Sequence, residues 1–149
     1  MTLKVYVIHG PNINLLGQRE PEFYGQDTFD ELNIRIKEHA RGLDIETRIM
    51  QSNSEGQIVD AIHEALPWAD AIIINPGAYT HYSYAIRDAI AAVRLPAIEV
   101  HLTNVHGREE WRRHSVISPV CTGQIIGFAS NSYLLALNAA RTVVDDSRR

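Results

Sequence analysis

The sequence predicts an α/β fold in which helices cover both faces of a parallel β-sheet. Short apolar runs alternate with amphipathic segments along the whole 149-residue chain. Several runs are apolar at consecutive positions, as in Ala71-Ile72-Ile73-Ile74, which is typical of strands buried on both faces. The 45% hydrophobic content is enough for one core, and we expect a single domain over residues 1–149.

The first strand and helix are predicted from an apolar run and a capping pattern. Residues 5–8 have the composition of a buried strand, and residues 27–41 have that of a helix. Thr28, followed three residues later by Glu31, matches the capping box at a helix start. Gly42 stands where a helix is expected to end.

The next two elements follow the same alternation. Residues 45–50 alternate like a strand, and residues 54–66 are predicted as a helix. Apolar residues recur in this second helix at four-residue intervals, at Ile58, Ile62 and Leu66. This spacing is typical of a helix, and Pro67 is expected to end it.

The second half of the chain adds three strands and two helices. Strands are predicted over residues 71–74, 95–102 and 125–128, and helices over residues 83–93 and 130–144. Five strands alternating with helices fit a flavodoxin-like, doubly wound parallel sheet with the strand order 2-1-3-4-5.

Polar residues follow the strands, and in such sheets ligands bind beyond the carboxyl ends of the strands. These segments are residues 9–24, 51–53 and 75–81, then Glu99, His101, Thr103 and Asn104, and a polar loop with Arg108, Arg112 and Arg113. So many ionisable and hydrogen-bonding groups at one edge predict a site for a polar small molecule.

The connection formed by residues 9–25 is long, polar and glycine-rich. Strand-to-helix connections usually take roughly 2–6 residues, and longer ones are commonly lids or binding loops. Arg19 and Tyr24 lie in this segment, and an arginine can favour the phenolate form that a tyrosine needs to act as a base. On the pair alone, a surface arginine and a packed tyrosine remain the simpler explanation.

Glu99 and His101 lie two residues apart on a strand, so their side chains point to the same side. A carboxylate beside an imidazole fixes its tautomer, which suits a general acid, although a polar pair at a strand end explains the spacing equally well. His106 and His114 lack the spacing of metal ligands, and we expect no metal. The single Cys121 excludes an internal disulfide.

Charge and hydropathy exclude several classes of partner. The formal net charge of −4, with both signs mixed along the chain, argues against nucleic acid. No stretch is apolar enough to cross a membrane, and the chain opens with strand-like residues rather than a signal peptide. We therefore expect a cytoplasmic protein.

Four motifs, in order along the whole chain, resemble the type II dehydroquinases (3-dehydroquinate dehydratases). The first is GPNINLLG at residues 10–17 with REP at 19–21 and YG at 24–25. The others are NPGAYTH at 75–81, EVHLTN at 99–104 and REEWR at 108–112. Departures from the family pattern are Ile13, Tyr82, Thr103, Trp111, Ala129 and Ser132, and they affect only the shape of the pocket and the start of the last helix.

The resemblance implies a lyase that removes water from 3-dehydroquinate by anti elimination through an enolate. Tyr24 would be the general base, held as phenolate by Arg19, and Asn12 with the Ala78 backbone would position a water at the enolate oxygen. His101, braced by Glu99, would be the general acid. The implied substrate-binding residues are Asn75, His81, Asp88, Leu102, Thr103 and Arg112.

The resemblance also implies no cofactor, and a homo-oligomer that is a dodecamer built from trimers, with Asp88 reaching a neighbouring active site. Two other functions remain to be weighed. A flavin- or phosphate-binding module of flavodoxin type would have a short first loop, which the Arg/Tyr loop contradicts. A non-catalytic scaffold is disfavoured because every expected catalytic side chain is present.

Overall fold

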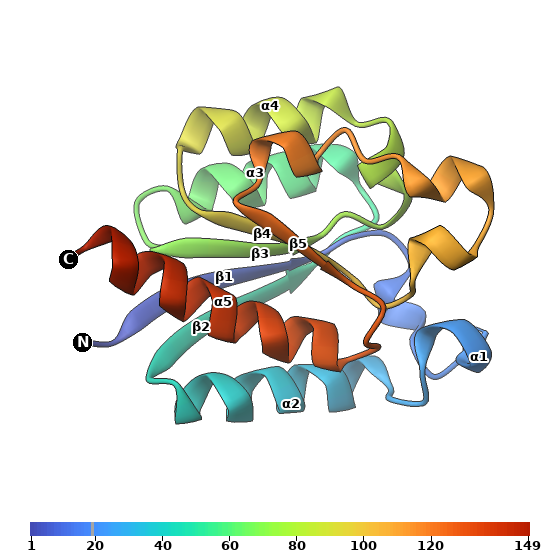
Figure 1. Cartoon of the computed structure of the whole chain (residues 1–149), viewed down its shortest axis with the longest axis horizontal. Helices are drawn as coiled ribbons and strands as arrows, with labels where there is room; N and C mark the ends of the chain where they lie inside the picture. The colour runs from blue at the N-terminus through green and yellow to red at the C-terminus, as the bar shows by residue number, and fades with distance from the viewer. Residues whose placement is uncertain (19) are drawn as a thin grey trace.

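The computed structural model describes residues 1–18 and 20–149 and contains a parallel five-stranded sheet (Figure 1). The strand order is β2-β1-β3-β4-β5. The strands are β1 (Leu3–His9), β2 (Ile45–Gln51), β3 (Ala71–Asn75), β4 (Ala97–His101) and β5 (Gly123–Ile126). The predicted fold class and strand order are confirmed.

Four helices cover the two faces of the sheet (Figure 1). α2 (Phe29–Gly42) and α5 (Asn131–Ser147) pack on one face, and α3 (Glu55–Ala65) and α4 (Tyr84–Val93) pack on the other. The connections contain the short α1 and five 3-10 segments. They are α1 (Pro21–Tyr24), η1 (Ile13–Leu15), η2 (Gly77–His81), η3 (Val105–Gly107), η4 (Glu110–Arg113) and η5 (Ser118–Val120).

Side-chain caps define where three of these helices begin. The predicted capping box is present: the Glu31 amide donates to Thr28 Oγ1 at 3.1 Å, and the Thr28 amide donates to Glu31 Oε1 at 3.5 Å. At α3 and α4 the cap is a serine hydroxyl alone: Ser54 accepts from the Gln57 amide, and Ser83 accepts from the Ile86 amide. The hydroxyl or carboxyl oxygen of such a residue satisfies an amide that has no partner within the helix.

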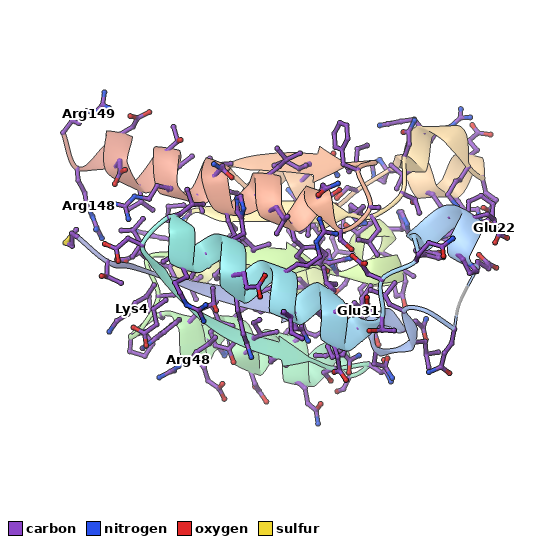
Figure 2. The ribbon with its side chains drawn as sticks, turned by 90° about the horizontal axis from the view of Figure 1, so that it is seen from below. Lys4, Glu22, Glu31, Arg48, Arg148 and Arg149 are labelled. Atoms are coloured by element: carbon purple, nitrogen blue, oxygen red, sulfur yellow. The ribbon has the colours of Figure 1, made fainter. Side chains whose placement is uncertain are left out.

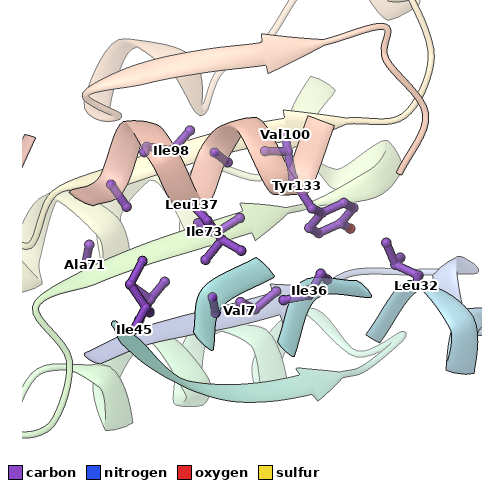
Figure 3. Close-up of a cluster of buried hydrophobic side chains, with 14 of the residues drawn as sticks. Val7, Leu32, Ile36, Ile45, Ala71, Ile73, Ile98, Val100, Tyr133 and Leu137 are labelled. Carbon is purple, nitrogen blue, oxygen red and sulfur yellow. The ribbon is translucent and has the colours of Figure 1, made fainter. Parts of the chain in front are cut away.

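The core consists of two apolar clusters, one on each face of the sheet. Figure 3 shows part of the cluster beneath α2 and α5, which includes Ile36, Val100, Leu137 and Tyr133. The other cluster includes Ile58, Ile62, Ile86 and Ile90. Both faces of the central strands are therefore buried, which explains their unbroken apolar sequences.

Two strand bounds predicted from the sequence were wrong in detail. The predicted strand 95–102 is restricted to Ala97–His101. The predicted strand 125–128 begins earlier and ends earlier, at Gly123–Ile126, because Gly127 turns the chain with a φ of +96°. The helix predicted over residues 54–66 is α3, of which Ser54 and Leu66 are the caps.

The chain termini lie at one end of the molecule, and the carboxyl ends of the strands lie at the other (Figure 1). Viewed from the side of α2 and α5, Lys4, Arg148 and Arg149 lie at the end where the chain termini meet, and Glu22 on α1 lies at the opposite end (Figure 2). Arg148 forms an ion pair of 2.6 Å with Asp70 at the terminal end. The carboxyl ends of the strands point the other way, toward α1 (Figure 1).

Within residues 1–18 and 20–149, none of the helices has the length and apolar character needed to span a membrane.

Ala129 links β5 to α5 in a backbone conformation that disfavours any side chain. Its φ is +51°, in the left-handed region. Its amide donates to the Leu102 carbonyl at 2.9 Å, which anchors the turn to the end of β4. A Cβ in this region costs roughly 1–2 kcal/mol, so the turn at Ala129 is strained.

Replacing Ala129 by glycine is expected to stabilise the protein. The gain should be about 0.5–1 kcal/mol, because relief of the left-handed strain outweighs the greater entropy of the unfolded chain. Urea unfolding at one protein concentration measures it. Ala92→Gly on the exposed face of α4 is the matched control and should destabilise by about 1 kcal/mol. Equal losses in the two variants would contradict the strain at Ala129.

Candidate active site

A cavity of about 100 Å³ lies at the carboxyl ends of β1, β3 and β4. It contains eight of the residues predicted for the site, namely Asn12, Tyr24, Asn75, His81, His101, Leu102, Thr103 and Arg112. Ala78, Arg108 and Trp111 also line it. The polar residues after three separate strands are therefore brought together, as the topology of a doubly wound sheet requires.

Glu99 and His101 form a buried pair at the end of β4. His101 Nε2 lies 2.5 Å from Glu99 Oε2, and the Glu99 side chain is fully buried. An ionised carboxylate only accepts hydrogen bonds, so Nε2 carries a proton in both forms of the imidazole. Nδ1 is then the nitrogen that gains and loses a proton, and His101 is the cavity-lining member of the pair.

Three further side chains donate to the Glu99 carboxylate. Thr80 Oγ1 lies 2.6 Å and Gln124 Nε2 lies 3.0 Å from Oε2, and Ser115 Oγ lies 2.9 Å from Oε1. Burial raises the pKa of Glu99, but the hydrogen bonds from His101, Thr80 and Gln124 together with the charge of His101 outweigh it, so the pKa lies below its usual value. Glu99 is therefore an ionised carboxylate at neutral pH, able to stabilise a protonated His101.

Tyr24 contacts Arg108, which the sequence analysis placed in the polar loop at the site without assigning it a role. Arg108 Nη1 donates to Tyr24 Oη at 3.0 Å and to Thr103 Oγ1 at 3.4 Å. The guanidinium also lies 4.7 Å from the centre of the Phe23 ring and 3.8 Å from Glu20. Arg108 therefore places a guanidinium, which is always charged, within hydrogen-bonding distance of the phenol oxygen.

The predicted partner of Tyr24, Arg19, lies outside the residues that the structure describes. The contact between Arg108 and Tyr24 was not predicted, because Arg108 is one of three arginines in a single polar loop, with Arg112 and Arg113, and spacing does not separate them. Its Nε is buried and has no hydrogen-bond partner within residues 1–18 and 20–149. The motif around residues 108–112 was the only signal for it.

His81 faces the cavity with a defined tautomer. Its Nδ1 lies 2.7 Å from the His114 carbonyl oxygen and must donate to it, which leaves Nε2 as the acceptor in the neutral ring. Burial lowers the pKa of His81, and the positive charges of His101 and Arg112 add to this effect despite the bond to His114. The edge of the Trp111 ring packs against His81, with ring centres 5.1 Å apart.

The remaining predicted residues occupy different positions. Asn12 has a left-handed backbone with a φ of +70°, and its amide donates to Asn53 Oδ1 at 3.1 Å. Leu102 and Thr103 are buried at the end of β4. Asp88 does not line the cavity of its own chain; it is exposed on α4, opposite the buried Ile86 and Ile90.

His9 ends β1 but is not among the residues that line the cavity. Its ring is fully buried between Asn33, Phe29 and Tyr133. Burial lowers the pKa of His9 to about 4, with the hydrogen bond to Asn33 acting in the opposite direction. His9 is therefore a neutral imidazole at physiological pH.

A parallel sheet with an imidazole–carboxylate pair and a guanidinium–phenol pair at one cavity defines an enzyme of the acid–base class. A family model described as Dehydroquinase class II matches residues 3–141. The chain belongs to this family.

Individual relatives agree with this assignment. A protein named 3-dehydroquinate dehydratase from Dictyoglomus turgidum is 60% identical over 137 residues, which cover 92% of this chain and 94% of the relative. A protein of the same name from Pelotomaculum thermopropionicum is 54% identical over 138 residues, covering 93% and 96%. The crystal structure of a type II dehydroquinase from Butyrivibrio crossotus superposes with a TM-score of 0.91 at 49% identity, covering 93% of this chain and 97% of that one.

Burial of neutral His9 predicts a loss of stability in mild acid. The unfolded chain binds a proton at His9 below its ordinary pKa of 6.5, whereas the folded protein does so only below about 4. Between pH 7 and pH 4.5 this difference should cost about 2–3 kcal/mol of unfolding free energy. Urea unfolding of the native protein and of His9→Gln measures it, because glutamine does not titrate. Parallel stability curves for the two proteins would refute the shift.

Proposed function

We propose that the protein converts 3-dehydroquinate to 3-dehydroshikimate, with Tyr24 as the general base and His101 as the general acid. The substrate is the one named in the similar proteins. The observation that carries the proposal is that Tyr24 and His101 line one cavity, each with its own charged partner. Anti elimination uses a base and an acid on opposite faces of one substrate, and this pair can supply both.

The first step removes the proton next to the ketone. Tyr24 as phenolate takes the proton, the C–H electron pair moves toward the ketone, and an enolate forms. A phenolate requires a nearby cation, because the free phenol has a pKa near ~10. The Arg108 guanidinium supports this role from 3.0 Å, and by resemblance Arg19 contributes as well.

The second step expels water. The enolate re-forms the ketone as the C–O bond breaks, and protonated His101 gives its Nδ1 proton to the departing hydroxyl. Glu99 stabilises the imidazolium before the transfer. Tyr24 ends as phenol and His101 as neutral imidazole, so one proton passes between them through solvent to restore the starting state.

The other cavity residues bind the substrate and its enolate oxygen. We assign a water held by Asn12 and the Ala78 backbone to the enolate oxygen. Asn75, Thr103 and the Leu102 backbone hold the substrate. Arg112 and neutral His81 contact its hydroxyls, with His81 Nε2 as an acceptor. Acid–base groups contribute on the order of 10²–10⁴-fold each and preorganised donors a comparable factor, so these side chains suffice in magnitude.

The proposed steps use no metal or cofactor. An imine mechanism would need a lysine at the substrate, and the chain has lysine only at positions 4 and 37. Both are exposed and neither lines the cavity. We further propose that the protein acts in the cytoplasm as a dodecamer built from trimers.

Formation of the conjugated enone, followed by ultraviolet absorbance with purified protein and 3-dehydroquinate, tests the activity. Tyr24→Phe should lower kcat by about 10²–10⁴-fold and change KM by only a few-fold, because only the base is lost. Tyr6→Phe is the matched control: its ring lies in the cluster on the α3–α4 face, outside the cavity, and its kinetics should match the native enzyme. Near-normal turnover by Tyr24→Phe would remove Tyr24 from the role of base.

Asp88 tests the proposed assembly. If its carboxylate reaches the active site of a neighbouring subunit, Asp88→Ala should raise KM or loosen the trimer although Asp88 lies outside its own cavity. Light scattering and steady-state kinetics measure the two effects. Asp60→Ala, an exposed aspartate on α3, is the control that should change neither. Native size and native kinetics in Asp88→Ala would make Asp88 an ordinary surface residue.

A further inference from the structure

Behind the cavity, four polar side chains form a continuous hydrogen-bond chain through the core. Asn75 Nδ2 lies 3.0 Å from Tyr133 Oη, which lies 2.9 Å from His9 Nδ1. His9 Nε2 lies 2.8 Å from Asn33 Oδ1. The chain crosses β3, α5, β1 and α2, and only Asn75 among its members lines the cavity.

One backbone amide sets the direction of the first bond. The Gly77 N–H lies 3.1 Å from the Asn75 side chain, and because this amide can only donate, the atom it meets must be Oδ1. The amide nitrogen of Asn75 is therefore turned toward Tyr133. This fixes the orientation of the Asn75 side chain, which its shape alone would leave ambiguous.

The direction of this first hydrogen bond determines the direction of the next two. The Tyr133 oxygen accepts from Asn75, so its O–H has one remaining partner within residues 1–18 and 20–149, which is His9 Nδ1. Nδ1 therefore carries the lone pair and Nε2 carries the proton, which His9 donates to Asn33 Oδ1. While His9 is neutral, each of these three hydrogen bonds can form in only this donor-to-acceptor direction.

The composition of the surrounding core argues that this chain does more than pack. Tyr133 is fully buried in an apolar cluster with Val100 and Leu137 (Figure 3). A phenylalanine would fill the same volume without a polar tip, and a buried hydroxyl or imidazole is costly unless it is hydrogen-bonded. Its hydroxyl connects the core to the cavity-lining Asn75.

We propose that Tyr133 and His9 are positioning residues that hold Asn75 with an N–H hydrogen presented to the substrate. Asn75 Oδ1 is committed to Gly77 and one Nδ2 hydrogen to Tyr133, so the second Nδ2 hydrogen is the donor left for a ligand. The substrate group that meets this hydrogen must then be an acceptor, such as a carboxylate or carbonyl oxygen. This inference rests on the proposed function, in which Asn75 holds the substrate.

A double-mutant cycle tests the coupling. Tyr133→Phe should raise KM about 3- to 10-fold with kcat within about twofold, which corresponds to one hydrogen bond. Tyr6→Phe makes the same chemical change in the opposite core cluster, where its hydroxyl meets Glu64, and should leave KM unchanged. In an Asn75→Ala background, Tyr133→Phe should have no further effect on KM, because its action passes through Asn75.

The outcomes separate the two hypotheses. Absent turnover in the native enzyme, or an unchanged KM in Asn75→Ala, would overturn the proposed function or the role of Asn75 in it. A raised KM in Asn75→Ala with an unchanged KM in Tyr133→Phe would overturn the positioning role alone. Additive effects in the double variant would do the same. Loss of packing alone lowers the unfolding temperature and leaves the KM of the folded enzyme unchanged.

The tautomer of neutral His9 provides a test that requires neither substrate nor the Tyr133→Phe variant. Imidazole nitrogen-15 resonances of the native protein, with those of His9 identified by their loss in His9→Gln, report which ring nitrogen carries the proton. We expect the neutral Nε2–H form at pH 7. The Nδ1–H form would reverse the bond to Tyr133 and overturn the proposal.

Discussion

The buried carboxylate of Glu99 is the interaction on which the rest of the active site depends. A fully buried negative charge is tolerated only when donors surround it. His101 comes from the same strand, whereas Thr80, Ser115 and Gln124 come from three other segments. The carboxylate therefore ties η2, the loop before η5 and β5 to the end of β4. The polar loop that contributes Arg108 and Arg112 lies between these attachment points, so its path across the cavity is determined by them.

The register of the parallel sheet aligns the ends of the strands that carry the other site residues. His9 pairs with Asn75, Ile74 with Glu99, and His101 with Ile126, so the ends of four strands lie at one level. Hydrogen bonds between strands hold these relative positions, which are then independent of the loops. The sheet thus supplies Asn75 and His101 on a rigid edge, and the connections bring Tyr24 and Arg108 over it. The proposed acid, His101, therefore lies on the sheet, whereas the proposed base, Tyr24, lies at the end of α1 in the connection between β1 and α2.

The sequence was sufficient for most of the fold because periodicity and capping are local properties. Thr28 and Glu31, three positions apart, identify a helix start, and the run 71–74 identifies a buried strand by itself. The end of β5 was misplaced because the turn depends on positive φ at Gly127 and Ala129, and the alanine gives no sign of it. Tyr24, Asn75 and His101 could be grouped from the rule for strand ends. Arg108 could not be distinguished from Arg112, because only the three-dimensional path of the loop shows which guanidinium meets the phenol.

His9 illustrates a limit of the strand-end rule with consequences for the whole domain. It ends a strand and is polar, so it was grouped with the site, yet its ring turns inward to meet Tyr133, 124 residues away in sequence. No local pattern contains a contact of that separation. Tyr133 lies in the first turn of α5, and Asn75 lines the cavity. The hydrogen bond between them therefore links the position of the last helix to the position of a cavity side chain. The strained turn at Ala129 determines where α5 begins. It therefore also influences where Tyr133 meets the cavity-lining Asn75.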